Sequence, residues 1–233
     1  MQKIIIFDEI WQTFQTKYDK ILKKGNNMEY NITTVEKAKE TLIKIKNNWP
    51  GIQLENVDYS KFHFILEHIT TNMDNCEKIK LRGLKTIKEL IEEPDNEFIK
   101  FCINESCKSK NEIEEVIKYY KRYNNKISAF FSYEDGKKQY ENNLEKYPEM
   151  FRKENFCLNS KALKEWNEKS KAYKVIAKVK YEEINFNVIQ EKDIAIKLAD
   201  NLRKKINNDE IKDCIVEIEN TIKPNRLLIE KIR

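Results

Sequence analysis

The two histidines are the first residues to test for chemistry. His63 and His68 are the only histidines in the chain. On a helix their i, i+5 spacing separates them by about 140° around the axis, whereas a zinc-binding helix of a metalloprotease needs i, i+4. No G-x-S-x-G or similar nucleophile motif accompanies them. We therefore expect His63 and His68 to have structural or surface roles, and we predict no metal site and no catalytic group.

Carboxylates and a lysine offer a second chemistry. Pro94-Asp95 followed by Asp135-Gly136-Lys137 matches the letters of the PD-(D/E)xK nuclease motif, in which two carboxylates bind Mg²⁺ and a lysine orients the attacking water. That chemistry requires the groups on adjacent strands of one sheet. The sequence instead places Asp95 between two expected helices and Asp135 in a helix or a turn. A metal-dependent nuclease is therefore the least favoured of three functions.

Glycine and cysteine usage bears on cofactors. The four glycines are too far apart for any two to close a loop of backbone amides around a phosphate. P-loop and dinucleotide-binding motifs are therefore absent, and we predict no cofactor. The five cysteines are scattered, and the closest pair, Cys102 and Cys107, has the spacing of neither a zinc knuckle nor a thioredoxin-like motif. Reduced cysteines in the cytosol fit this pattern.

The segment Lys161–Lys180 stands out for its charge. It holds seven lysines and only two acids, with a tryptophan and a tyrosine among them. If it is a β-hairpin, Lys174, Lys178 and Lys180 share one face; if it is helical, four of the lysines fall within about 80° of one another. A solvated lysine face is the alternative. We name as the basic strip, and predict as the partner-binding site, Lys164, Lys171, Lys174, Lys178, Lys180, Trp166 and Tyr173.

A second basic-aromatic cluster lies on a helix expected at 111–124. Mixed aromatic and basic side chains are common anchors of protein interfaces, and they also occur on ordinary helix edges. Lysine greatly outnumbers arginine in the chain, which disfavours readout of base edges. Binding through either cluster should therefore be electrostatic and weakly sequence-specific. The residues of this second cluster are Lys118, Tyr119, Lys121, Arg122 and Tyr123.

Sparse glycine and proline, four of each, predict a mostly α-helical fold. We expect a multi-helix bundle of antiparallel helical hairpins. Alternation of apolar residues with lysine and asparagine predicts one small β-hairpin at 173–189, with a continued helix as the alternative. Apolar residues in steps of three and four predict helices at 4–21, 33–49, 60–69, 79–91, 95–107, 111–124, 125–147, from 160, 190–207 and 209–222.

Composition bounds the class of protein. Apolar residues make up 40% of the chain and the net charge is +5, so a core can form. No run approaches the roughly 20 apolar residues of a membrane span, and the N-terminal apolar run is too short for an export signal. We expect a cytoplasmic protein that does not bind membranes. Its organisation is an N-terminal helical lobe at 1–150 and a C-terminal basic helical lobe at 151–233, or one continuous domain.

These observations favour a non-catalytic protein, not an enzyme, that occupies a surface on a protein or nucleoprotein partner. The abundance of lysine, asparagine and isoleucine suggests AT-rich codons, which would suit a phage or mobile-element inhibitor of a host defence complex, of the anti-CRISPR type. Nucleic-acid binding without sequence specificity, through phosphate contacts of the basic strip, is the second function. No segment carries a motif specific enough to indicate a family. Charge reversal of Lys171, Lys174 and Lys178 should weaken partner capture.

Overall fold

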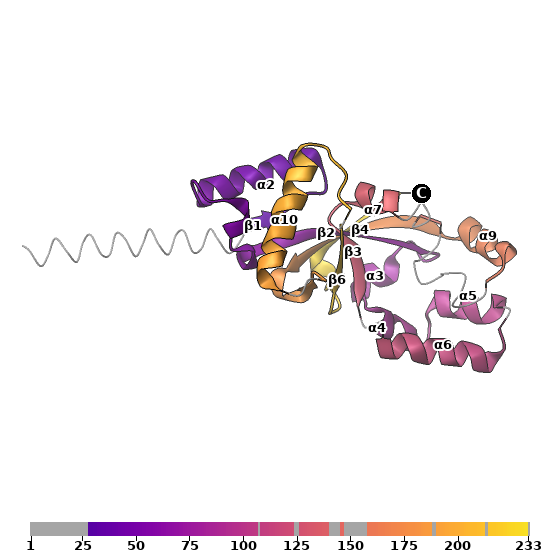
Figure 1. Cartoon of the computed structure of the whole chain (residues 1–233). Helices are drawn as coiled ribbons and strands as arrows, with labels where there is room; N and C mark the ends of the chain where they lie inside the picture. The colour runs from indigo at the N-terminus through magenta and orange to yellow at the C-terminus, as the bar shows by residue number, and fades with distance from the viewer. Residues whose placement is uncertain are drawn as a thin grey trace, which may run out of the picture.

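The structure, a computed structural model, describes residues 28–106, 108–123, 126–139, 145–146, 158–187, 190–212 and 214–232. Its strands form one seven-stranded sheet with helices packed around it, an α/β fold (Figure 1). The prediction of an all-α helical bundle is therefore wrong. The described elements are β1 (Met28–Tyr30), α2 (Val35–Asn48), η1 (Leu54–Asn56), η2 (Tyr59–Lys61), β2 (Phe62–Asn72), α3 (Glu77–Arg82), α4 (Ile87–Glu92), α5 (Glu97–Glu105), α6 (Lys110–Tyr123), β3 (Ile127–Phe130), α7 (Tyr133–Gln139), α9 (Ser160–Lys169), β4 (Lys171–Lys180), η4 (Tyr181–Glu183), β5 (Ile184–Asn185), α10 (Glu191–Ile206), β6 (Ile215–Ile218), η5 (Pro224–Arg226) and β7 (Leu227–Lys231).

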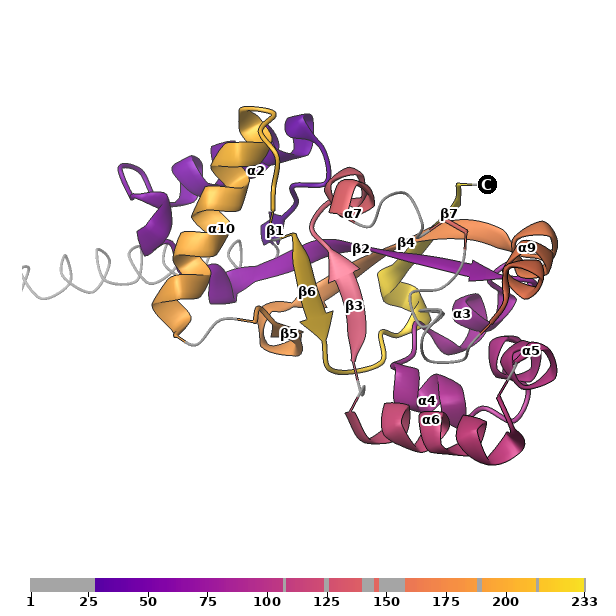
Figure 2. The same ribbon diagram turned by 45° about the vertical axis from the view of Figure 1, so that its right-hand side comes forward.

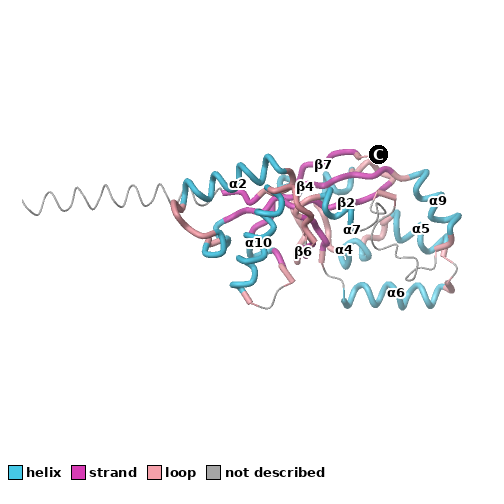
Figure 3. Tube along the Cα trace, turned by 45° about the horizontal axis from the view of Figure 1, so that its top comes forward, coloured by secondary structure: helices cyan, strands magenta, loops and turns pink. Residues whose placement is uncertain are grey.

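The strand order is β5-β6-β3-β2-β4-β7, and β1 adds to β2. Figure 3 shows β4 running between β7 and β2. The long strand β2 pairs antiparallel with β4 along ten residues, from His63 opposite Lys180 to Asn72 opposite Lys171. It also pairs antiparallel with β3 and parallel with β1. The pairs β3–β6, β5–β6 and β4–β7 are antiparallel. Strands from both sides of residue 150 therefore form a single sheet.

The central strand β2 was predicted as a helix at 60–69. Phe62, Ile65, Leu66 and Ile69 fit helical spacing, but Phe62, Phe64 and Leu66 also alternate, and all three are buried. Short apolar runs satisfy both periods, so periodicity cannot decide between them. The segment is extended here because β2 forms hydrogen bonds with β3 on one edge and with β4 on the other.

Of two further helix predictions, 209–222 is wrong and 125–147 is confirmed only for the residues of α7. At 125–147 the chain forms β3 and then α7, and at 209–222 it forms β6. In β3 the side chains of Ile127 and Ala129 alternate into the core. Gly136 lies inside α7, and a Cβ there would stand 2.5 Å from the Phe130 ring. This glycine permits close helix–strand packing and does not form the turn that was the alternative.

The segment 173–189 contains strands, as alternation predicted, but no hairpin. β4 pairs with β2 and β7, whereas β5 pairs with β6. The short helix η4 separates β4 from β5. Local alternation therefore identified an extended conformation but not the strand partners.

Several helix predictions are confirmed: 33–49 as α2, 95–107 as α5, 111–124 as α6, the helix from 160 as α9, and 190–207 as α10. The predicted helix 79–91 is interrupted at Gly83, which ends α3 with a φ of 91°. A Cβ at Gly83 would stand 2.2 Å from the Ile222 carbonyl oxygen, so only glycine allows this approach. The predicted helix 4–21 lies outside the described residues.

One group of helices packs with the sheet around its main core. α2 and α10 lie together at one end of the molecule (Figure 1). Their residues Ala38, Ile45 and Leu198 join a core that includes Phe64 and Val216 of the sheet. The Tyr30 hydroxyl donates to the Leu198 carbonyl at 2.6 Å, which ties α10 to β1. Aromatic and aliphatic packing therefore stabilises the contact of α2 and α10 with the sheet.

A second group, α5, α6 and α9, lies at the opposite end together with α4 (Figure 2). It has its own smaller core, in which Phe101 and Trp166 contact each other with ring centroids 5.1 Å apart. The Trp166 indole nitrogen donates to the Thr71 hydroxyl of β2 at 2.9 Å. The group formed by α4, α5, α6 and α9 thus joins the sheet at the end of β2.

Candidate functional site

The lysines of the basic strip lie mainly on one strand. Lys174, Lys178 and Lys180 share one face of β4, as the extended alternative predicted, and Tyr173 faces the other side. Tyr173 and Trp166 are both buried. Their hydroxyl and indole groups bond inside the protein, to Asn75 and Thr71. The structure therefore brings three lysines together on a surface and places the two aromatic residues elsewhere.

Every lysine of the strip has a polar partner within the chain. Lys171 donates to the Asn75 side chain at 2.7 Å. The other lysines form ion pairs. The carboxylate beside each ammonium offsets its charge, so the positive potential extends a shorter distance from the surface. The nitrogen–oxygen distances are 3.8 Å for Lys164–Glu168, 3.3 Å for Lys174–Glu67, 2.9 Å for Lys174–Glu230, 2.7 Å for Lys178–Glu29 and 3.4 Å for Lys180–Glu182.

The second basic-aromatic cluster lies on α6. Tyr119 is 59% exposed, and Lys118 pairs with Glu115 at 2.7 Å. The side chains of Lys121, Arg122 and Tyr123 lie outside what the structure describes.

The two histidines lie on β2, five residues apart, and therefore on opposite faces of the sheet. His68 Nδ1 is 2.8 Å from the Ser128 carbonyl oxygen, so this nitrogen carries the proton and donates. Burial lowers the pKa of His68. Burial and the nearby Lys178 lower the pKa of His63. Within the described residues no group of three or more metal-ligating side chains is found.

The residues of the nuclease motif belong to three separate ion pairs. Asp95, between α4 and α5, pairs with Lys78 at 3.2 Å. Asp135, in α7, pairs with Lys205 of α10 at 2.8 Å. Lys137 pairs with Glu145 at 2.9 Å. Neither aspartate lies on a strand, so the geometry that the two-carboxylate chemistry requires is not formed by these residues.

Sequence reasoning missed a buried charged network beside the sheet. Glu67 of β2 is 4% exposed and accepts from the Tyr133 backbone amide at 2.5 Å. Lys205 donates to Asp135 and to the Ser132 hydroxyl, each at 2.8 Å. Burial raises the pKa of Glu67, against the attraction of Lys174. No local pattern signals this network, because its members come from β2, α7, β4 and α10.

An apolar patch lies on the same sheet face as the strip lysines. Ile176 of β4 is directly opposite Leu228 of β7, and Ile65 of β2 is directly opposite Lys178. Leu228 is 59% exposed, whereas Ile65 and Ile176 are half-buried. The ion pairs Lys174–Glu230 and Lys178–Glu29 flank this patch. We define the Ile176 face as Glu29, Ile65, Lys174, Ile176, Lys178, Leu228 and Glu230.

A cavity of about 160 Å³ lies between the sheet and the helices beside the end of β2. β2, β3, α3, α4 and α9 contribute to it, and its walls are largely aliphatic. Polar groups in the lining include His68, Lys78, Lys85 and Glu93. The apolar lining includes Ile79, Leu84, Ile87, Leu90, Ile91 and Trp166.

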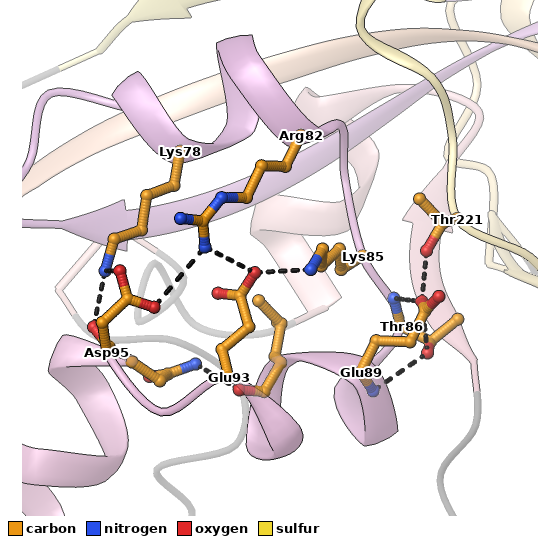
Figure 4. Close-up of polar contacts among 10 residues, drawn as sticks. Lys78, Arg82, Lys85, Thr86, Glu89, Glu93, Asp95 and Thr221 are labelled. Carbon is orange, nitrogen blue, oxygen red and sulfur yellow. Dashed lines mark hydrogen bonds and ion pairs between the residues drawn. The ribbon is translucent and has the colours of Figure 1, made fainter.

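Ion pairs join the helices beside this cavity (Figure 4). Arg82 of α3 contacts Glu93 at 3.2 Å and Asp95 at 3.4 Å, and Lys85 contacts Glu93 at 2.5 Å. The Glu93 side chain is 8% exposed, so these cations neutralise a nearly buried carboxylate. We call Lys78, Arg82, Lys85, Glu93 and Asp95 the Glu93 network.

A second contact fixes α4 to the sheet (Figure 4). Thr86 caps α4 by accepting from the Glu89 amide, and Glu89 accepts from the Thr86 amide at 3.0 Å. The Thr221 hydroxyl, which follows β6, also donates to the Glu89 carboxylate. Leu84 forms a β-bridge with Ile222 next to this contact. These contacts anchor the N-terminal end of α4, and the Glu93 network holds the residue that follows its C-terminal end.

No protein-family model, no curated protein and no solved structure matches this chain. The site must therefore be interpreted from its own chemistry. Among the described helices, none is both long enough and apolar enough to cross a bilayer.

Proposed function

We propose that this protein is a non-catalytic binding protein that captures a folded protein partner through the Ile176 face. The observation that carries the proposal is Leu228, a large apolar side chain 59% exposed beside Ile176. An apolar centre surrounded by polar groups is the usual anatomy of a protein–protein interface. Here cross-strand ion pairs flank the apolar centre.

The charge of this face favours a protein over a nucleic acid. Phosphate binding gains free energy when cations replace the counterions of the backbone. Lys174 and Lys178 lie within 3 Å of Glu230 and Glu29, so a phosphate there would also meet a carboxylate. A protein surface with both signs of charge can pair with such a rim. The strip lysines therefore contribute orientation rather than a positive field.

Two matched substitutions test the proposal. Leu228→Arg places a charge in the apolar centre, whereas Ile43→Arg does so on α2, where Ile43 is 58% exposed and lies outside the face. In capture from a nuclease-treated lysate of the organism that carries the gene, proteins retained by the wild type and by Ile43→Arg should fall at least tenfold with Leu228→Arg. Equal capture by all three proteins, or no capture by the wild type, would contradict the proposal. Thermal melting checks that both variants fold.

The basic strip is best tested at Lys178. Lys174 also contacts the buried Glu67, so reversing its charge would disturb the core. Lys178→Glu should reduce the association rate of the captured partner, and the reduction should shrink as salt rises. A gel shift with DNA or RNA that persists at about 150 mM salt would favour the nucleic-acid alternative instead. Light scattering that shows a dimer lost with Leu228→Arg would identify a second copy as the occupant and contradict the proposal.

A further inference from the structure

We propose that the cavity between β2 and the helices α3, α4 and α9 binds a small uncharged aromatic molecule that donates one hydrogen bond to His68. The cavity is separate from the Ile176 face, because none of the residues that define that face lines it. The inference therefore does not depend on partner capture.

Its volume suits a ligand of one or two rings. Engineered apolar cavities of about 150 Å³ stay dry and bind benzene. The cavity here has about 160 Å³ and walls that include Ile87, Leu90 and Trp166. Transfer of an aromatic ring from water to such walls is favourable in proportion to the apolar area buried. Free volume and apolar lining together supply the affinity.

One polar group defines the orientation of the ligand. His68 lines the cavity, and its Nδ1–H donates to the Ser128 carbonyl at 2.8 Å. The neutral imidazole then presents Nε2 as an acceptor, and no described residue donates to it. Burial lowers the pKa of His68 and keeps the ring neutral. A ligand N–H or O–H is the group that complements this nitrogen.

The charges that border the cavity exclude an ionic ligand. Lys78, Lys85 and Lys126 line it, and each is already paired with a carboxylate, at distances of 3.2 Å, 2.5 Å and 2.5 Å. An anion would have to compete with those carboxylates, and Asp74 and Glu97 also border the cavity. A cation would lose its hydration against aliphatic walls. An uncharged ring with one donor avoids both losses.

Indole and benzofuran distinguish the donor from the shape. The two bicyclic molecules have nearly the same outline, but benzofuran has an ether oxygen in place of the indole N–H. Calorimetric titration of the full chain should show both binding, with indole about tenfold tighter because one hydrogen bond is gained. Indole should also move the ¹⁵N resonance of His68 Nε2. Equal affinities, stronger binding of benzylamine or benzoate, or no binding at millimolar ligand would overturn the proposal.

Three variants place the ligand. Leu90→Trp fills the cavity and should abolish binding of both molecules, whereas Leu81→Trp, at a 76% exposed position of α3 outside the lining, should leave it unchanged. His68→Asn retains an amide donor for the Ser128 carbonyl and removes the Nε2 acceptor. It should erase the preference for indole while benzofuran still binds. Unchanged indole binding in Leu90→Trp would also overturn the proposal.

Discussion

The strand β2 passes through two different surroundings. Around Phe64, with no exposed surface, the rings of Tyr30, Phe131 and Phe186 lie with centroids 5.2–6.4 Å away. Toward His68, the same strand borders the cavity of about 160 Å³. Aromatic rings fill the first region, whereas aliphatic side chains and paired charges leave free volume in the second.

This difference separates stability from binding. A close-packed interior loses contacts with every deletion, and it has no room for a ligand. A region with existing free volume loses fewer packing contacts when a side chain is shortened, and it can admit a small molecule. We therefore expect the Phe64 region to determine the stability of the fold and the His68 region to tolerate change.

The largest expected effect is a deletion in the packed region. Phe64→Ala should lower the free energy of unfolding by about 4 kcal/mol, because a fully buried ring leaves a cavity that neighbours fill only partly. Leu90→Ala, at a half-buried position that already borders free volume, should lower it by about 1 kcal/mol. Urea denaturation measures both. Similar losses for the two variants would remove the distinction between the regions.

Buried charge gives the next effect. Lys205→Met leaves Asp135, whose side chain is 5% exposed, without its ion pair, and should lower the free energy of unfolding by about 3 kcal/mol. The double variant Lys205→Met/Asp135→Leu should recover to within about 1 kcal/mol of the wild type. In the Glu93 network, Arg82→Met should lower it by less than about 1 kcal/mol, because Arg82 is 47% exposed and Lys85 still pairs with Glu93. A double variant as unstable as Lys205→Met alone would contradict this account.

The smallest effect concerns pH. The pKa of His68 is lowered in the folded protein, so the unfolded chain binds the proton more readily. This contribution to stability is complete above the unfolded pKa of about 6.5 and is lost as pH falls below it. Between pH 7.5 and 5.5 the melting temperature of His68→Asn should fall less than that of the wild type, by about 2–4 °C. Parallel melting curves for the two proteins would refute a buried neutral His68.

Part of the site could be predicted from sequence. Alternation in Lys171–Lys180 correctly indicated that Lys174, Lys178 and Lys180 share a face if the segment is extended. It could not reveal Glu230 of β7, which pairs with Lys174, or Glu29 of β1, which pairs with Lys178. Net charge along a segment therefore overestimates the field at the surface when the partners lie far away in the chain.

The cavity had no signal in the sequence. Its lining residues are spread along the chain from His68 to Trp166. Its shape depends on two contacts, that of Thr221 with Glu89 of α4 and that of Ile222 with Leu84. The apolar residues Ile87 and Leu90 have the ordinary spacing of a core-facing helix. Nothing in that spacing tells whether the facing side chains meet or leave a space.

Helix and strand periods explain what could be read locally. The segments that became α2, α9 and α10 have a helical period and suitable caps or polar faces. A helix forms without pairing to a distant strand. The residues of β2 satisfy both periods, and only pairing with β3 and β4 selected the extended form. Helical hydrogen bonds close within one segment, whereas a strand depends on partners that can be more than a hundred residues away. For that reason the α2 and α10 helices were readable from their own residues, while the sheet, its ion pairs and the cavity beside it arose only in the folded chain.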